Sequence, residues 1–245
     1  MFNSLPSPII FAHRGASLRA PENTLAAFVL AKAEGADAIE LDVKLSADGI
    51  PVVMHDPTVD RTTDGSGAVA TLGLPALKEL DAGDGQRIPT LEEVFAEMGK
   101  DFLINIELSN YTTPNDSLVD EVVDLVEKHQ RSETVLFSSF LAKNLKRAEA
   151  LLPQTPRGLL ALPNFFGWWV RNLVFRLGDY QALHPHFHNV SARSVARVHK
   201  MNRRVHVWTL NQEENIRKFA EMGVDGIFTD DPRSAHQLLR STKKE

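Results

Sequence analysis

IIFAHRGASLRAPENTLAAFVLAKAEGADAIELDV, residues 9–43, shows the pattern that organises the whole chain. It opens with the apolar run IIFAH (9–13) and closes with AIELDV (38–43), both typical of buried strands. Between them, TLAAFVLAKAEG (24–35) has the apolar spacing of a helix and stops at a glycine, as helices commonly do. A helix between two buried strands is the crossover unit of a parallel sheet, so this stretch predicts one β-α-β unit.

The same alternation of apolar runs and amphipathic segments continues along the chain. The further predicted strands are 103–108, 134–139, 157–162, 182–187, 204–210 and 226–230. The further predicted helices are 90–99, 117–129, 141–152, 165–178, 195–201, 215–223 and 234–240. Eight strands and eight helices in 245 residues predict an α/β fold, the TIM (β/α)8 barrel. A doubly wound open sheet is the competing architecture, but no GxGxxG motif follows the first strand, which favours the barrel.

One segment, residues 51–89, interrupts the alternation. Asp48-Gly49 is a turn signal, so DGIPVVMHD (48–56) predicts the second arm of a hairpin. The rest of the segment is rich in loops, with two short apolar patches. We interpret it as a small insertion after strand 2 that covers one mouth of the barrel, and residues 1–245 as a single domain.

Composition excludes several classes of protein. The net charge of −5 gives no basic footprint for nucleic acid, and the absence of cysteine excludes disulfides and cysteine chemistry. The N-terminal MFNSLPSP lacks the charged-then-apolar pattern of a signal peptide, and no apolar run reaches the roughly 18 residues that span a bilayer. We therefore expect a soluble, cytoplasmic protein.

Acidic residues gather at the predicted carboxyl ends of two strands. Glu40 and Asp42 are two residues apart on one strand, so both side chains point to the same face. Glu107 stands at a matching height on the next predicted barrel strand. Three converging carboxylates suit a hard divalent cation, Mg²⁺ or Ca²⁺, better than Zn²⁺. The alternative is that these acids form structural ion pairs with lysines.

Histidine and arginine belong to the same predicted mouth. His13 and His55 come from different segments, and histidine is the usual acid or base at neutral pH. Arg14 offers a planar fork for phosphate oxygens, and Gly15 lets the backbone turn away. Asp56 either orients His55 or simply begins the next loop. A cation, two histidines and an arginine are the groups that phosphate-ester cleavage needs.

Taken together, these motifs resemble the glycerophosphodiester phosphodiesterase family, particularly its short bacterial cytoplasmic members. The matching residues are His13-Arg14-Gly15, Pro21-Glu22-Asn23-Thr24, Glu40-Leu41-Asp42, His55-Asp56, Arg61-Thr62-Thr63, Asn105-Ile106-Glu107, Trp208-Thr209-Leu210-Asn211 and 223–230. The resemblance covers nearly the whole chain, and the combined order and spacing of its motifs are highly specific.

The resemblance implies a TIM barrel that hydrolyses glycerophosphodiesters to glycerol 3-phosphate and an alcohol. It implies that Glu40, Asp42 and Glu107 bind Mg²⁺ or Ca²⁺, that His13 and His55 act as the acid–base pair, and that Arg14 holds phosphate. The insertion resembles the family's small cap. Glu22 matches a motif near the site, or else orders the first helix turn. Trp208 either stacks on the substrate or packs in the core.

One position departs from the family pattern. The family usually reads Glu-x-Lys at the end of this strand, with the lysine near the phosphate, whereas this chain reads Glu107-Leu108-Ser109. Either Arg14 and the cation suffice, another basic residue substitutes, or turnover is slow. This departure motivates one alternative function, a weakly active phosphodiester-binding protein. A second alternative, a lysophospholipase D acting on lysophospholipids, would be distinguished by its dependence on chain length and by residues 159–178.

The segment LLALPNFFGWWVRNLVFRLG, residues 159–178, is unusually apolar. Helical spacing predicts that one stripe packs on the barrel; it consists of Phe166, Trp169 with Val170, Leu173 and Leu177. A second apolar stripe lies on another face and consists of Phe165, Trp168 and Phe175. The second stripe indicates a homodimer contact or packing on neighbouring helices. Alternatively, Phe165 lies by the mouth and contacts a lysophospholipid chain or a membrane surface.

Overall fold

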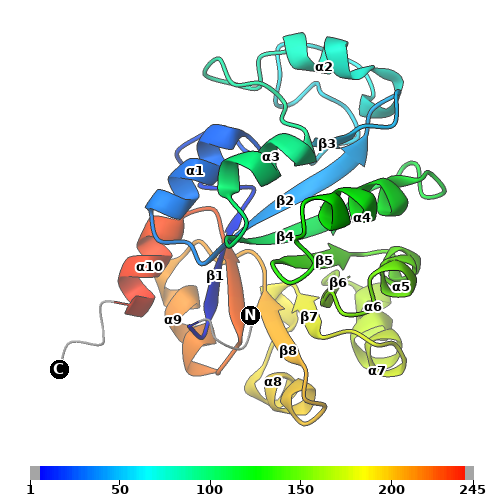
Figure 1. Ribbon diagram of the computed structural model, residues 1–245. Coiled ribbons are helices and arrows are strands. Elements are labelled where there is room, and N and C mark those ends of the chain that lie inside the picture. Colours follow the sequence, from blue (N-terminus) through cyan, green and yellow to red (C-terminus); the bar gives the residue numbers. More distant parts are fainter. Residues whose placement is uncertain (1–5, 241–245) are drawn as a thin grey trace.

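The computed structural model describes residues 6–240 and contains a closed barrel of eight parallel strands surrounded by helices (Figure 1). The barrel strands are β1 (Ile9–His13), β2 (Ala38–Leu45), β4 (Leu103–Leu108), β5 (Val135–Ser139), β6 (Arg157–Ala161), β7 (Ala182–Pro185), β8 (Arg204–Val207) and β9 (Gly226–Thr229). β1 pairs in parallel with both β2 and β9, which closes the sheet. The predicted barrel is therefore confirmed, and an open sheet is excluded.

Helices follow the strands at nearly the predicted positions. They are α1 (Leu25–Ala33), α3 (Leu91–Met98), α4 (Leu118–Lys128), α5 (Ala142–Leu151), α6 (Phe165–Trp169), α7 (Phe175–Leu177), α8 (Ala192–His199), α9 (Glu213–Glu221) and α10 (Pro232–Arg240). α8 begins three residues before the predicted helix, because Ser191 and Ser194 form a reciprocal cap that supplies its first turn with hydrogen-bond partners. No helix within residues 6–240 is long and apolar enough to cross a membrane.

Strand side chains alternate between two apolar clusters. Outward residues such as Ile39 and Leu41 pack against the helices in the main core, whereas inward Phe11, Ala38 and Leu103 form a smaller cluster inside the barrel. Continuing this alternation along β2 turns residues 40, 42 and 44 inward, above that cluster. The lower half of the barrel interior is thus apolar, and its upper layer is polar.

The insertion is built on a hairpin, as predicted. β3 (Pro51–Val53) pairs antiparallel with β2, and the chain then forms the short helices η2 (Val69–Thr71) and α2 (Leu74–Glu79) beyond the tip of β2 (Figure 1). These elements share an apolar cluster of their own, which contains Val52, Met54, Val59, Val69, Leu77, Ala82 and Ile88. That all of residues 1–245 form one domain stays a prediction, since residues 1–5 and 241–245 lie outside the described part.

The predicted packing of residues 165–178 is right for Val170, Phe165 and Trp168 but wrong for five other apolar residues. The segment contains α6, a π-helical turn η3 (Val170–Val174) and α7, and it buries Val170 and Phe175. Phe175 had been placed on the outer stripe. The exposed side chains include four residues that the helical spacing assigned to the barrel: Phe166, Trp169, Leu173 and Leu177. In a π turn the hydrogen bonds join residues five apart, so Val170 and Phe175 lie on the same, inward face. The α-helical spacing of three or four residues therefore does not identify the buried side.

Candidate active site

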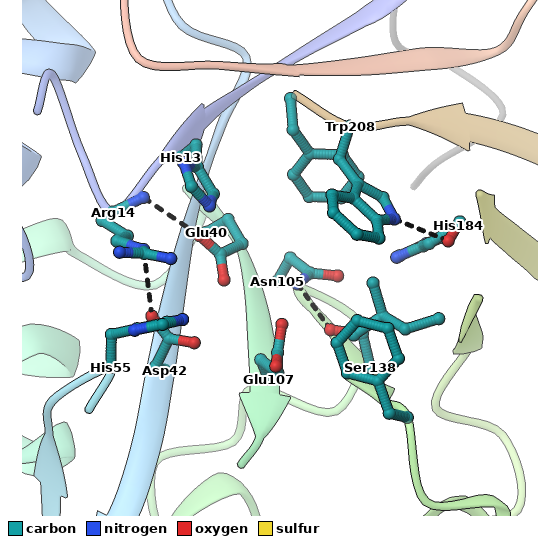
Figure 2. A pocket seen from close by; sticks show the side chains of 13 residues that line it. His13, Arg14, Glu40, Asp42, His55, Asn105, Glu107, Ser138, His184 and Trp208 are labelled. Atoms are coloured by element: carbon teal, nitrogen blue, oxygen red, sulfur yellow. Dashed lines mark hydrogen bonds and ion pairs between the residues drawn. The ribbon is translucent and has the colours of Figure 1, made fainter. Parts of the chain in front are cut away.

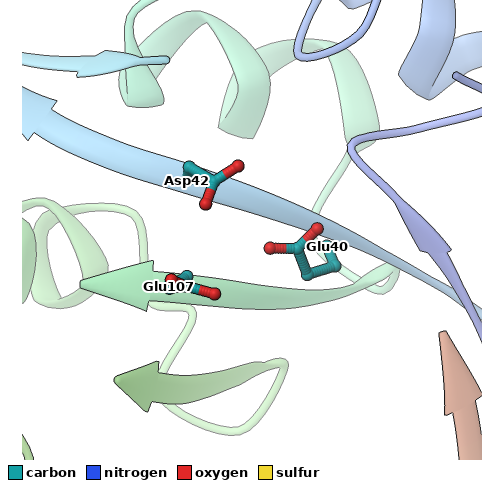
Figure 3. Close-up of side chains that lie close together, drawn as sticks. All are labelled: Glu40, Asp42 and Glu107. Atoms are coloured by element: carbon teal, nitrogen blue, oxygen red, sulfur yellow. The ribbon is translucent and has the colours of Figure 1, made fainter. Parts of the chain in front are cut away.

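Three carboxylates converge inside the barrel mouth (Figure 3). Glu40 and Asp42 extend inward from β2, and Glu107 extends from β4, where Asp42 and Glu107 are paired in register. Each offers an oxygen within 4.8 Å of an oxygen of the other two. Glu40 and Asp42 are buried, and Glu107 is partly exposed. The cause is local. Glu40 and Asp42 are two residues apart on β2 and so point to the same face, and Glu107 lies beside Asp42 on the neighbouring strand.

Crowding of like charge makes this cluster unfavourable by itself. Burial, followed by the charges of Asp42 and Glu107, raises the pKa of Glu40 well above its usual range. Burial, followed by the charge of Asp42, raises the pKa of Glu107 to about 8. Within residues 6–240 one cation forms an ion pair with the cluster: Arg14 Nε lies 3.5 Å from Asp42 Oδ2. Lysine pairing therefore does not explain the acids, and an all-oxygen donor set of this charge fits a hard divalent cation.

His13 is held by an aspartate from the far end of the chain. It ends β1, and its Nδ1 lies 2.6 Å from Oδ1 of Asp230, the residue after β9. The Ser17 hydroxyl donates to the same oxygen at 3.2 Å. A carboxylate at Nδ1 fixes the ring orientation and leaves Nε2 for proton transfer.

His55 has an equivalent partner beside it in sequence. Its Nδ1 lies 2.6 Å from Asp56 Oδ1, and Arg61 Nε donates to Asp56 Oδ2 at 2.5 Å. The hydrogen bond from Arg61, together with that from His55, lowers the pKa of Asp56 to about 2. Asp56 therefore orients His55, which settles the choice that the sequence left open.

Arg14 sits between the carboxylates and the first helix. Its backbone N–H donates to Glu40 Oε2 at 3.0 Å, and its Nη1 donates to Glu22 Oε1 at 3.0 Å. The turn that places it needs Gly15, which has φ +86° and where a Cβ would lie 2.6 Å from the Cβ of Ala27. Although burial lowers the pKa of Arg14, the charges of Asp42, Glu40 and Glu22 raise it overall, so the guanidinium stays charged.

These groups line one pocket with a polar and an apolar side (Figure 2). Its lining consists of His13, Arg14, Glu40, Asp42, His55, Asn105, Glu107, Ser138, Phe140, Leu160, His184, Trp208 and Phe228. Trp208 is fixed by a 2.7 Å hydrogen bond from its Nε1 to the His184 carbonyl and by an edge contact with Phe140. The pocket can thus hold a charged group at one wall and an apolar or ring-shaped group at the other.

Known protein families include one whose members match this chain over most of its length. Residues 13–234 match the profile of the glycerophosphoryl diester phosphodiesterase family. The chain belongs to this family. A glycerophosphodiester phosphodiesterase of Caldanaerobacter subterraneus subsp. tengcongensis is 39% identical over 240 residues, which cover 95% of this chain and 98% of that protein.

Solved structures agree with this assignment. A phosphodiesterase from Oleispira antarctica, in complex with the product sn-glycerol-3-phosphate, is 33% identical with a TM-score of 0.85, covering 95% of this chain and 96% of that one. A glycerophosphodiester phosphodiesterase from Thermotoga maritima is 30% identical with a TM-score of 0.76, covering 94% of this chain and 97% of that one.

Not every residue predicted for the site lines the pocket of this family member. Glu22 does not line it but accepts hydrogen bonds from both Arg14 and Arg61, and so connects the segments that carry these two arginines. Phe165 is 76% exposed and does not belong to the pocket lining. A substrate contact for Phe165 stays a prediction.

Sequence reasoning missed two groups. Asp230 ends the predicted strand 226–230, but its contact with His13 depends on the pairing of β9 with β1, which the sequence does not show. Lys44 was overlooked, although the alternation that turns Asp42 inward also turns Lys44 inward. Its ammonium donates to the Ser109 carbonyl at 2.8 Å and to the Ser109 hydroxyl at 2.7 Å. A buried cation from β2 thus lies beside the position where the family usually has lysine.

Proposed function

We propose that this protein hydrolyses glycerophosphodiesters to glycerol 3-phosphate and an alcohol, with one divalent cation, Mg²⁺ or Ca²⁺, held by Glu40, Asp42 and Glu107. The observation that carries the proposal is a single pocket in which two histidines, each paired with an aspartate, flank this carboxylate cluster. The family assignment and the product complex of the Oleispira antarctica relative support the same substrate class.

Three buried atoms of the pocket lining make no hydrogen bond to a described residue: Arg14 Nε, Asn105 Oδ1 and His184 Nδ1. Arg14 Nε is within ion-pair distance of Asp42, and it and Asn105 Oδ1 favour an anionic ligand that carries hydroxyl groups. Buried polar atoms are normally satisfied, and a phosphoryl group offers acceptors for a guanidinium while a glycerol hydroxyl can donate to an amide oxygen. We assign Arg14 to the phosphate and Trp208 to the glycerol or alcohol group.

The histidines supply the proton transfers. A free hydroxyl of the glycerol attacks phosphorus while one histidine takes its proton at Nε2, and the other histidine donates a proton to the departing alkoxide. The products of this step are a cyclic phosphate and the alcohol. Water then opens the cyclic phosphate with the histidine roles reversed. A cation held by Glu40, Asp42 and Glu107 would neutralise charge on the phosphoryl oxygens, and Asp230 and Asp56 stabilise the protonated rings.

Release of glycerol 3-phosphate from glycerophosphocholine tests the proposal, with Mg²⁺, Ca²⁺ or EDTA present. We expect activity with at least one cation and none with EDTA, and we expect Glu40→Ala and His13→Ala to abolish it. A diester without the neighbouring hydroxyl should be inert. Rapid cleavage of that analogue would refute the cyclic intermediate while leaving the hydrolysis itself in place.

A second candidate function, lysophospholipase D, is favoured by the apolar wall of the pocket. Leu160 belongs to β6, and the exposed Leu162, Phe165 and Trp168 follow it along the chain. An acyl chain leaving the pocket at this wall would meet them. Turnover should then rise with chain length and fall in Phe165→Ser/Trp168→Ser for long chains alone. Equal turnover of lysophosphatidylcholine by both proteins would exclude this candidate.

A further inference from the structure

Seven large apolar side chains are exposed together on the segment that follows β6. We call them the aromatic surface; it consists of Leu162, Phe165, Phe166, Trp168, Trp169, Leu173 and Leu177. They are seven of the eleven large apolar residues that are exposed within residues 6–240. The Phe165 and Trp168 rings stack with centroids 6.2 Å apart, and Trp168 meets Trp169 edge-on at 6.0 Å. These contacts join three of the rings into one exposed apolar area, and an area of this kind marks an interaction site.

Charge is distributed unevenly along the chain, and the aromatic surface lies in its basic part. Residues 150–212 contain eight lysines and arginines but one acidic residue, Asp179. This part therefore carries a net charge of +7 in a protein whose net charge is −5. Such asymmetry indicates an acidic partner for this part of the molecule.

Basic residues in and after α8 approach the segment of the aromatic surface in space as well as in sequence. Arg203, in the loop between α8 and β8, donates to the carbonyls of Phe175 and Gly178, which ties this loop to α7 and to the residue after it. Arg197 is close enough to Arg171 that its charge, after burial, lowers the pKa of Arg171. Within residues 6–240, no carboxylate pairs within 4.0 Å with Arg176, Arg193 or Arg197. These charges remain available to an external anion.

We propose that the aromatic surface and its bordering arginines dock this protein onto an anionic lipid bilayer. Tryptophan, phenylalanine and leucine enter the boundary between headgroups and acyl chains, while arginines attract anionic headgroups. A second copy of the chain fits this surface less well, because a two-fold contact would bring two sets of unpaired arginines together.

Docking of this kind places the active site near lipid. Leu162 follows β6 directly, and Leu160 of β6 lines the pocket, so the aromatic surface begins at the mouth of the barrel. The inference goes beyond the proposed hydrolysis, because docking needs no turnover. It adds a location for the reaction, at a surface where phosphodiesters are released from phospholipids.

Co-sedimentation with vesicles tests the proposal on the full chain. We expect binding to vesicles of phosphatidylcholine mixed with phosphatidylglycerol, and at least tenfold weaker binding to phosphatidylcholine alone. Raising NaCl from about 0.1 M to about 1 M, which shortens the Debye length from about 10 Å to about 3 Å, should weaken binding to the mixed vesicles. Equal binding to both kinds of vesicle, or to neither, would overturn the proposal.

Two variants separate the apolar and the basic contributions. Phe166→Ser/Leu173→Ser/Leu177→Ser removes exposed apolar groups, and Arg176→Gln/Arg193→Gln/Arg197→Gln removes unpaired charges. Each should weaken vesicle binding at least tenfold. Glycerophosphocholine turnover and the melting temperature should stay unchanged, because none of these side chains lines the pocket or is buried.

Matched controls carry the same chemistry on other faces of the molecule. Val29→Ser removes an exposed apolar group from α1, and Lys100→Gln/Lys128→Gln/Lys143→Gln removes three exposed charges near α3, α4 and α5. Both controls should bind mixed vesicles like the unmodified protein. Equal weakening in control and test variants would overturn the proposal, as would a concentration-dependent dimer that the apolar variant abolishes. Loss of hydrolysis with vesicle binding intact would count against the proposed function alone.

Discussion

His13 and His55 reach the mouth by different routes but are held in the same way. Each presents Nδ1 to an aspartate oxygen at 2.6 Å, and the proposed mechanism uses Nε2 of each for proton transfer. Asp56 is adjacent to its histidine in sequence, whereas Asp230 is 217 residues away from His13. The two aspartates should therefore matter for the rate of the chemical step more than for substrate or cation binding.

Asp230→Asn tests this at one histidine. We expect the variant to lower kcat about 10- to 100-fold with little change in KM, because the amide no longer stabilises the protonated ring. Steady-state kinetics with glycerophosphocholine measures both constants. Asp231→Asn is the matched control, since Asp231 pairs with Arg19 and Ser234 and not with a histidine. An unchanged kcat in Asp230→Asn would remove Asp230 from the mechanism.

Lys44 offers a second test at the scale of single residues. Its buried ammonium donates hydrogen bonds to Ser109, and burial lowers its pKa. It lies beside the position at which the family usually has a lysine and this chain has Ser109. We expect Lys44→Met to lower kcat/KM about tenfold or more, because less positive charge then faces the phosphodiester.

The double variant Lys44→Met/Ser109→Lys checks the reason for that loss. A lysine returned to the position where the family usually has one should recover most of the activity. If the double variant is as inactive as Lys44→Met, then Lys44 does not act by providing a positive charge near residue 109. Melting temperatures of all three proteins keep a folding defect apart from a loss of charge.

Secondary-structure elements differ in how far their own sequence defines them. In β2, inward Glu40 and Asp42 alternate with outward Ile39 and Leu41, so strand, face and site follow from the period of two. In residues 165–177 the apolar spacing predicted the wrong inward face, because the π turn changes which residues share a side. Spacing rules assume regular geometry, and this helix is not regular.

Phe175 and Phe166 provide the test at the scale of the helix. Phe175 is fully buried and lies under Arg203, whereas Phe166 is 67% exposed. Phe175→Ala should lower the free energy of unfolding by about 3–5 kcal/mol, and Phe166→Ala by about 0.5 kcal/mol or less. Denaturant titration of both variants measures the difference. Similar losses in the two variants would contradict the packing described for η3 and α7.

Barrel closure is the feature of the whole molecule on which the site depends. β1 lies between β2 and β9, so the first, second and last barrel strands deliver His13, Glu40 and Asp230 to one mouth. Closure also buries three carboxylates together, and burial, followed by the charge of Asp42, raises the pKa of Glu107 to about 8 from an ordinary 4.5. Folding and cation binding must therefore both depend on pH.

Without a cation, folded Glu107 keeps a proton between about pH 4.5 and pH 8, where the unfolded chain has lost it. The free energy of unfolding of EDTA-treated protein should therefore fall as pH rises through this window. A cation displaces the proton, so its apparent affinity should rise about tenfold per pH unit up to about pH 8. Thermal melts with EDTA and with Mg²⁺ measure both effects. Glu107→Gln should flatten the decline, and an unchanged slope would show that Glu107 is not its source.

The sequence by itself predicted eight β-α units, because each unit carries its own hydrophobic period, and it favoured a closed barrel over an open sheet. It also determined that Glu40 and Asp42 share a face, and its motifs pointed to the family. Tertiary structure alone decided which aspartate holds His13, that Lys44 meets Ser109, and which face of residues 165–177 is buried. Those facts depend on contacts between distant segments and on irregular helix geometry, neither of which leaves a periodic signal in the chain.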